Sequence, residues 1–245
     1  MLRTIPAATQ PFQIGTPMNI RRIIVLFAAA WVSTLTVQAG NLDAITNQEA
    51  GSGLREALTR AGEAAVGQLG VQDGFYGNDK VRIPLPGNLQ KAEKLLRTLG
   101  MGKQADELEL TMNRAAESAV VQAKPILVSA VKKMTWQDAK SILTGGDNAA
   151  TDYFRRTTSD ALTTKFKPIV HQATSRLSLA EKYDAYAGKG AEMGLVKPED
   201  ANLDDYVTRK TLDGLFVIMA DKEKAIRQDP IGQGSALLKK VFGAL

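Results

Sequence analysis

Residues 202–230 carry a strongly apolar helix pattern and read NLDDYVTRKTLDGLFVIMADKEKAIRQDP. Asn202 is a typical helix N-cap, and two acids follow in the first turn, where the helix dipole favours negative charge. Residues 212–220 are apolar at all but two positions, so this part of the helix has almost no polar face to turn toward water. Pro230 ends the helix. A helix buried almost all round requires other elements packed on every side of it.

The elements upstream of this helix show the same periodicity. Apolar residues recur every three or four positions, the period of an amphipathic helix, and the alternation of a half-buried strand is almost absent. We therefore predict an all-α fold with several helices in a single domain. The further predicted helices are 48–69, ended by Gly70; a hairpin of 88–99 and 105–119 around Gly100-Met101-Gly102; one that Asp147 caps, with a break or kink at Pro168; and a short amphipathic helix at 235–245.

The middle of the chain resembles itself at a spacing of 43 residues. Lys124-Pro125-Ile126-Leu127 returns as Lys167-Pro168-Ile169-Val170. Further corresponding positions are Thr135 with Ser178, Asp138 with Glu181, and Gly145 with Gly188. Within each copy, Thr135 with Asp138 and Ser178 with Glu181 have capping-box spacing, and the glycines suit helix ends. We predict a duplicated helical unit of about 43 residues. Two copies are fewer than a solenoid needs, and chance similarity between alanine-rich helices is the alternative.

The composition is that of a globular protein, and it excludes several kinds of chemistry. The 245 residues include 44% hydrophobic and 23% charged side chains, enough to bury a core in one or two domains. The chain has no Cys and a single His. Disulfides, thiolate metal sites, Cys nucleophiles and multi-histidine metal sites are therefore excluded. We expect no metal and no cofactor.

The first 39 residues have the order of a secretory signal peptide. A basic segment at 18–22 precedes an apolar stretch at 23–35, and small residues lead to Ala39, after which we predict cleavage. The apolar stretch is short for a membrane span, and an uncleaved N-terminal anchor is the alternative. Met18 is a candidate for the true start. We predict an exported, periplasmic protein whose mature domain, residues 40–245, has no transmembrane segment.

The net charge of the mature chain argues against nucleic acid as a partner. Removing residues 1–39 takes away three arginines and no acids, which leaves 28 basic against 26 acidic side chains. A chain so close to neutrality gives no electrostatic reason to bind nucleic acid. The expected partner is an envelope protein or a small ligand.

Residues 71–87, here called the aromatic loop, form the one long stretch without a helical period. The loop contains the adjacent aromatics Phe75 and Tyr76, then Arg82, and two prolines two residues apart that forbid a regular helix. A loop of this length inside a compact domain is usually functional or locally ordered. Its aromatic side chains either fix the loop onto the helical core or contact a partner. We include Phe75, Tyr76 and Arg82 among the candidate binding residues.

A second candidate site comes from polar residues in the two predicted repeats. Asn113 and Arg114 lie in the part of the first copy that matches Arg155 and Arg156 in the second. If the two units pack against each other, the guanidinium groups form a fork for a carboxylate or phosphate. Asp152, Arg155 and Arg156 are also the candidate side chains for an enzyme. The alternative is that the arginines pair with acids on neighbouring helices.

No other constellation in the sequence points to a reaction. His171 has no second His for a metal, and a catalytic role needs a nucleophile and an orienting acid that the sequence does not place beside it. The acids of the aromatic loop lack the spacing of a calcium loop and are typical of turns and caps. Gly145-Gly146-Asp147 lacks the preceding strand and the Gly-Lys-Ser/Thr ending of a phosphate loop.

Several segments together resemble a known family, the exported bacterial proteins catalogued as the domain of unknown function 4197 family. The resemblance covers the chain from about residue 42 to the C-terminus. The segments that carry it are Asp73-Gly74-Phe75-Tyr76-Gly77-Asn78, Ile83-Pro84-Leu85-Pro86, Lys91-Ala92-Glu93-Lys94-Leu95-Leu96, Met112-Asn113-Arg114-Ala115-Ala116-Glu117, Gly145-Gly146-Asp147, Tyr153-Phe154-Arg155-Arg156 and Leu203-Asp204-Asp205-Tyr206-Val207. It implies a single helical domain and export, and it supplies no catalytic residues.

Three functions fit the sequence. The first is an exported all-α binding or interaction protein of the cell envelope, with the aromatic loop and the arginine-bearing helices as its contact surfaces. The second is an envelope hydrolase or lyase that uses carboxylate and arginine side chains, for which convergence in one deep pocket would be required. The third is a carrier of an apolar ligand, which would need an interior cavity of hundreds of Å³.

Overall fold

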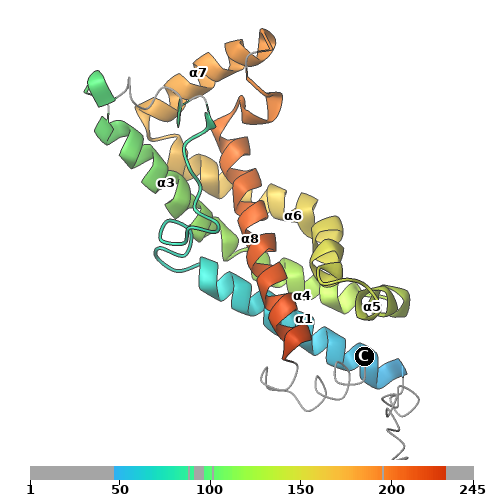
Figure 1. The fold of residues 1–245 in the computed structure, drawn as a ribbon. Helices are drawn as coiled ribbons and strands as arrows, with labels where there is room; N and C mark the ends of the chain where they lie inside the picture. The colour runs from blue at the N-terminus through green and yellow to red at the C-terminus, as the bar shows by residue number, and fades with distance from the viewer. Residues whose placement is uncertain (1–46, 88, 91–96, 101, 195, 230–245) are drawn as a thin grey trace, which may run out of the picture. The chain divides into compact units, whose positions relative to one another are not determined.

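The computed structural model describes residues 47–229, apart from 88, 91–96, 101 and 195, and within these residues it contains helices and no strand (Figure 1). The described residues belong to one compact unit. The α-helices are α1 (Asn47–Leu69), α3 (Gly102–Val120), α4 (Ala123–Lys133), α5 (Trp136–Leu143), α6 (Ala149–Thr174), α7 (Ser178–Glu192) and α8 (Leu203–Gln228). A short 3-10 helix, η3 (Pro198–Asp200), precedes α8. The predicted all-α fold is confirmed.

Helix α8 is the element around which the others pack, since α1, α3, α6 and α7 all contact it (Figure 1). Its predicted N-cap is confirmed, because the Asn202 side chain accepts a hydrogen bond from the Asp205 N–H at 3.0 Å. Most of its apolar residues are buried, but Val217 is 40% exposed. The prediction that this part of the helix is buried on almost every side is therefore wrong at Val217. The side chains of Asp213 and Asp221 on the same strip are about half exposed, at 48% and 45%, because the surrounding helices leave this strip uncovered.

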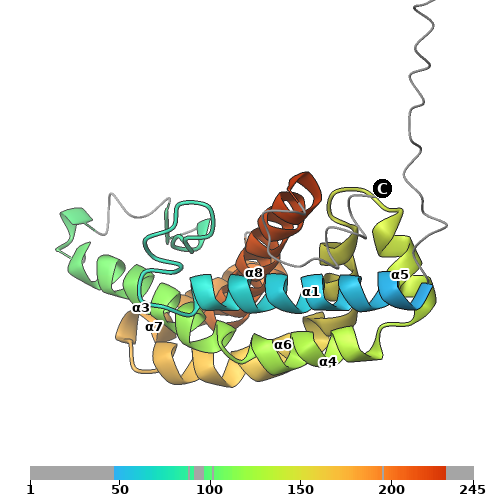
Figure 2. The ribbon, with the colours of Figure 1, turned by 90° about the horizontal axis from the view of Figure 1, so that it is seen from below.

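Helices α1, α4 and α6 lie side by side and alternate in direction (Figure 2). Arg55 near the start of α1 donates to the carbonyl of Met134 after α4 at 2.9 Å, and Glu63 near its end pairs with Lys124 at 3.1 Å. These two contacts require α1 and α4 to run antiparallel. Helix α6 then runs back along α4, and the Tyr153 hydroxyl donates to the Ala130 carbonyl at 2.9 Å.

The start of α6 differs from the predicted one. Asp147 does not cap it: the helix begins at Ala149, and its N-cap residue, Asn148, makes no side-chain capping bond. A glutamate from α8 accepts hydrogen bonds from the first-turn N–H groups instead, as described below. Of the break or kink predicted at Pro168, the break is absent, because α6 continues through this residue to Thr174.

The predicted duplication is not confirmed, because the two copies differ where the pattern expected them to be alike. Thr135 and Asp138 form the predicted capping box at the start of α5. The corresponding Ser178 is the first residue of α7, and the N-cap residue there is Leu177, without a side-chain capping bond. Gly188 does not end α7, which continues to Glu192.

Some predicted elements fall outside the described residues. They are the signal peptide, the helix at 235–245 and most of the helix at 88–99. The turn of the predicted hairpin is described at Gly100, whose φ of +77° favours glycine. The second helix of that hairpin is confirmed as α3, and the apolar stripe predicted for it is buried. The helix predicted at 48–69 is confirmed as α1, which ends at Leu69, immediately before the predicted stop at Gly70.

The contact of the aromatic loop with α8 gives a stability prediction. A methyl group at position 214 would lie 2.6 Å from Cε1 of Phe75, whose side chain is fully buried. We expect Gly214→Ala to lower the free energy of unfolding by about 1–3 kcal/mol through overpacking, as measured by urea denaturation. Gly188→Ala is the matched control, because a methyl group there meets nothing within 4 Å. It should be neutral or stabilising by up to about 1 kcal/mol. Equal effects at both positions would contradict the overpacking argument.

Candidate functional site

Glu117 fixes the aromatic loop to α3. Its Oε1 accepts hydrogen bonds from the backbone N–H groups of Phe75 at 3.1 Å and Tyr76 at 3.2 Å. Its Oε2 accepts from Arg114 at 2.7 Å, and the same guanidinium group reaches Asp73 at 2.8 Å. Glu117 is only 5% exposed, and a buried carboxylate needs donors of this kind around it. Arg114 is therefore engaged with two acids.

Asn113, one turn before Glu117 on α3, holds the loop at a second point. The side chain of Asn113 accepts from the N–H of Ile83 and donates to the carbonyl of Ile83, both at 2.8 Å. It thereby pairs with the loop backbone as a neighbouring strand would. From α8, the Tyr206 hydroxyl donates to the carbonyl of Pro84 at 3.0 Å. The loop is thus ordered by side chains from two helices.

The aromatic side chains of the loop have different surroundings. Phe75 is fully buried against α8 and fixes the loop to the core. The ring of Tyr76 is partly exposed, and the guanidinium carbons of Arg82 and Arg114 lie 4.2 Å and 5.9 Å from its centroid. Arg82 also pairs with Glu109 at 2.9 Å. Tyr76 and Arg82 reach the surface, but the cations around the ring already have carboxylate partners.

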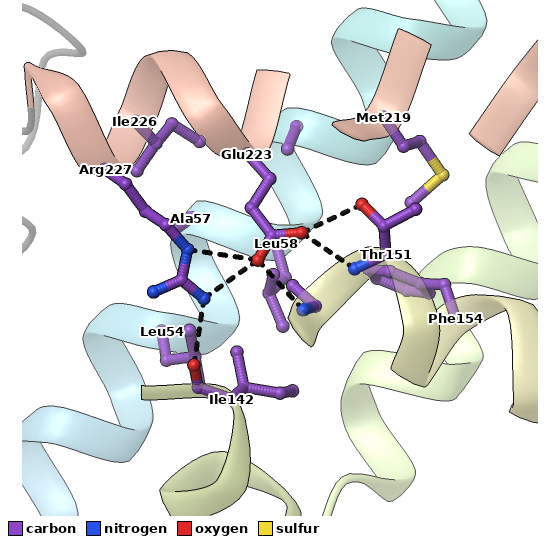
Figure 3. Close-up of a pocket in the computed structure, with 12 residues that line it drawn as sticks. Leu54, Ala57, Leu58, Ile142, Thr151, Phe154, Met219, Glu223, Ile226 and Arg227 are labelled. Atoms are coloured by element: carbon purple, nitrogen blue, oxygen red, sulfur yellow. Dashed lines mark hydrogen bonds and ion pairs between the residues drawn. The ribbon is translucent and has the colours of Figure 1, made fainter. Parts of the chain in front are cut away.

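A second buried carboxylate, Glu223 of α8, lies at the start of α6 (Figure 3). Its Oε1 accepts from the N–H of Ala150 at 2.9 Å, and its Oε2 accepts from the N–H and hydroxyl of Thr151 at 2.9 and 2.8 Å. Arg227 donates to Oε1 at 2.8 Å and to the carbonyl of Ile142 at 2.9 Å. The positive end of the α6 dipole further favours this anion. Glu223 therefore acts as the missing cap of α6.

The cavity beside Glu223 is small. Its volume is about 20 Å³, roughly the space of one water molecule. Its walls are mainly apolar side chains of α1, α6 and α8 (Figure 3). This cavity is far below the hundreds of Å³ that an interior carrier site requires.

A larger hollow lies on the surface between α4 and α6, and we call it the α4–α6 groove. Its volume is about 590 Å³, within the range of small-molecule sites. Its lining includes the apolar side chains of Ile126, Ala130 and Ala161, here called its floor, of which Ala130 is buried, Ile126 is half-buried and Ala161 is exposed. The groove therefore has an apolar base that solvent reaches.

Three cationic side chains rim the α4–α6 groove: Lys133, Arg156 and Lys165. None of them forms an ion pair with another described residue. Asp138 is the single carboxylate in the lining, and it accepts hydrogen bonds from the backbone and hydroxyl of Thr135 at 3.0 and 2.6 Å. These bonds hold the pKa of Asp138 below its usual value, and the bond from the Thr135 hydroxyl has the largest effect. The charge of Arg156 lowers this pKa further. Positive charge therefore exceeds negative charge in the groove by two.

The other candidate residues do not join Arg156 in the groove. Arg155 faces α8, where its guanidinium lies 3.5 Å from Asp213 and 4.6 Å from the ring centroid of Phe216. Asp152 is exposed on α6 and is not part of the groove lining. The structure therefore does not bring Asp152, Arg155 and Arg156 into one pocket.

Sequence reasoning missed two features, both formed by residues far apart in the chain. The orienting acid of His171 is Asp204, 33 residues away, with Oδ2 at 2.6 Å from Nδ1 of the exposed imidazole. The Thr174 hydroxyl donates to the other oxygen of Asp204. The second missed feature is the pair of lysines, Lys133 and Lys165, that line the same groove as Arg156. No local pattern marks either of these contacts.

Two further observations concern metals and membranes. Within the described ranges of the chain, no three His, Asp or Glu side chains gather closely enough to hold a metal ion. None of the helices described combines the length and the apolar character needed to cross a membrane.

The Asn113 contact predicts a strong effect of truncation. Asn113→Ala leaves the buried N–H and carbonyl of Ile83 without partners, and we expect a loss of at least about 2 kcal/mol in the free energy of unfolding. Hydrogen exchange should show faster exchange of the Ile83 amide. Glu109→Gln, which removes only the partly exposed pair with Arg82, should cost less than about 1 kcal/mol. An unchanged exchange rate at Ile83 in Asn113→Ala would argue against this anchor.

The Tyr206 anchor predicts a pH dependence. Burial, with a contribution from the charge of Asp200, raises the pKa of Tyr206 from 10.0 to about 12. The neutral phenol therefore contributes stability that is complete below pH 10 and is lost as the pH rises to about 12. Urea denaturation across this range should show a smaller loss of stability for Tyr206→Phe than for the unmodified protein. Parallel curves for the two proteins would contradict the prediction.

Comparison with known proteins identifies one family. The family model described as a protein of unknown function (DUF4197) matches residues 44–243. Neither a search of curated proteins nor a search of solved structures gave a match. The match covers most of the chain and agrees with the resemblance carried by the aromatic loop and the helices around it. The chain therefore belongs to the DUF4197 family.

Proposed function

We propose that this protein is a binding protein and that the α4–α6 groove holds an anionic group of its ligand. One observation carries the proposal: Lys133, Arg156 and Lys165 rim a single hollow and have no ion-pair partner among the described residues. By contrast, Arg114 and Arg155 both pair with acids. An anion from a ligand can therefore bind these cations in the groove, as protein carboxylates bind Arg114 and Arg155.

The side chains of the groove suit an oxyanion. Arg156 offers a planar fork of donors that can bind two oxygens of a phosphate or carboxylate, and Lys133 adds a compact positive charge. The guanidinium carbon of Arg156 lies 5.8 Å from the ring centroid of Tyr153, whose hydroxyl is fixed to Ala130. The rigid ring limits the directions that Arg156 can take, and this favours a preformed site. Because the rim is exposed, salt should weaken the interaction.

The geometry supports binding better than catalysis. A hydrolase or lyase of the kind considered above needs an acid or a base within hydrogen-bond reach of the substrate. Asp138, the carboxylate in the groove lining, is occupied in the capping box of α5, where it bonds to the N-cap residue Thr135, and Asp152 lies outside the lining. The groove therefore offers charge for recognition without a free carboxylate for proton transfer.

The place of action is part of the proposal. The basic, apolar and small segments within residues 18–39 have the order of an export signal, and we propose that the mature protein meets its ligand in the periplasm. An anionic ligand in this compartment can be an envelope component or a solute, and the groove is open enough to receive either.

A phosphate titration tests the groove. Inorganic phosphate, added to the isotope-labelled full chain at low salt, should shift the amide signals of α4 and α6 around Lys133 and Arg156. We expect Arg156→Gln to weaken binding by about tenfold, the effect of one charge-assisted hydrogen bond. Arg155→Gln is the matched control, because its guanidinium faces α8 outside the groove.

A second pair of variants checks the same site from the other helix. Lys133→Gln should weaken phosphate binding, whereas Lys132→Gln, the neighbour outside the groove lining, should not. Equal losses in the groove variants and their controls, or signal shifts spread over all basic surfaces, would show that phosphate recognises only general positive charge and would overturn the proposal.

A further inference from the structure

The charges of the α4–α6 groove are distributed unevenly along its length. Lys133 ends α4, and Arg156 lies in the second turn of α6, which runs back along α4 (Figure 2). These two cations therefore lie toward the same end of the groove, close to Asp138, whose pKa responds to Arg156. Lys165 follows Arg156 by nine residues of helix, or about 13 Å along its axis. One end of the groove thus has two cations, and the other end has one.

The middle of the groove is apolar, although two threonines line it. The hydroxyls of Thr157 and Thr158 donate to carbonyls one turn earlier in α6, at 2.8 and 2.6 Å. The hydroxyl protons of both threonines are therefore bonded to the helix backbone, and their methyl groups can contact an apolar ligand. Ile126, Ala130 and Ala161 complete this surface, and the alanines leave space above it.

A small inorganic anion would use the charged end and leave the apolar middle in contact with water. We propose, resting on the function proposed above, that the ligand is a single-chain amphiphile. Its phosphate or carboxylate head lies between Lys133 and Arg156, and its alkyl chain runs over Ala130 and Ala161 toward Lys165. The methylene stem of Lys165 can cover the chain while its ammonium group stays in water.

A chain-length series tests this inference. Butyl, octyl and dodecyl phosphate are titrated into the full chain below their micelle concentrations, with inorganic phosphate and neutral dodecyl maltoside as reference ligands. Complete burial of a methylene corresponds to roughly fourfold in affinity and burial on an open floor to about half of that free energy. We therefore expect binding to tighten by about twofold per methylene until the chain outgrows the floor. Dodecyl maltoside should bind at least about tenfold more weakly than dodecyl phosphate.

Two variants separate the head from the chain. Ala161→Gln places a polar side chain on the floor, so it should remove the dependence on chain length and retain phosphate binding. Thr164→Gln is its matched control on α6, outside the groove lining, and should behave like the unmodified protein. Arg156→Gln should weaken the binding of every phosphate in the series by a similar factor.

The possible failures are distinguishable. Equal affinity for inorganic, butyl and dodecyl phosphate would overturn the amphiphile and leave the anion site standing. Equal affinity for dodecyl maltoside and dodecyl phosphate would also overturn the amphiphile proposal. So would a chain-length dependence that Ala161→Gln leaves unaltered, since the alkyl chain would then bind elsewhere on the protein. Absence of binding by every phosphate would overturn the proposed function itself.

Discussion

Backbone N–H groups that packing removes from water must find acceptors, and in this protein carboxylate side chains from other elements supply several of them. Glu117 of α3 receives the aromatic loop, and Glu223 of α8 receives the start of α6. Asp184 of α7 receives the N–H of Leu203 at the start of α8 at 2.7 Å. Each carboxylate joins two separate elements of the fold. The arrangement of the helices therefore depends on these acceptors as much as on apolar burial.

The same constraint shapes the surface on which we base the function. Glu117 and Glu223 each have an arginine on the same helix, Arg114 and Arg227, so their charges are balanced inside the protein. Arg82 and Arg155 also have acid partners. The three cations that line the α4–α6 groove differ from these arginines, because none of them forms an ion pair with another described residue. Their charge is available to a ligand because no carboxylate in the described part of the chain forms an ion pair with them.

The candidate site could be predicted only in part. The sequence pointed to Arg114 and Arg156 alike, since both lie in amphipathic helices of similar composition. Their roles differ because Arg114 faces the aromatic loop and its acids, whereas Arg156 faces α4 across a hollow. Lys133 and Lys165 have the spacing of ordinary solvated lysines, and nothing local distinguishes them. Which cation finds a partner depends on which helix lies opposite, and helix pairing has no signature in a single amphipathic stripe.

Local sequence patterns predict the helical fold, the ends of α1 and α8, the Asn202 cap and the capping box of α5. These features follow from interactions within a few residues, such as apolar periodicity and side chains that bond the next turn. Helix packing, by contrast, establishes that Glu223 caps α6, that Asp204 orients His171 and that α4 and α6 form a groove. The physical reason is distance along the chain: these contacts join residues that only the packing of whole helices brings together.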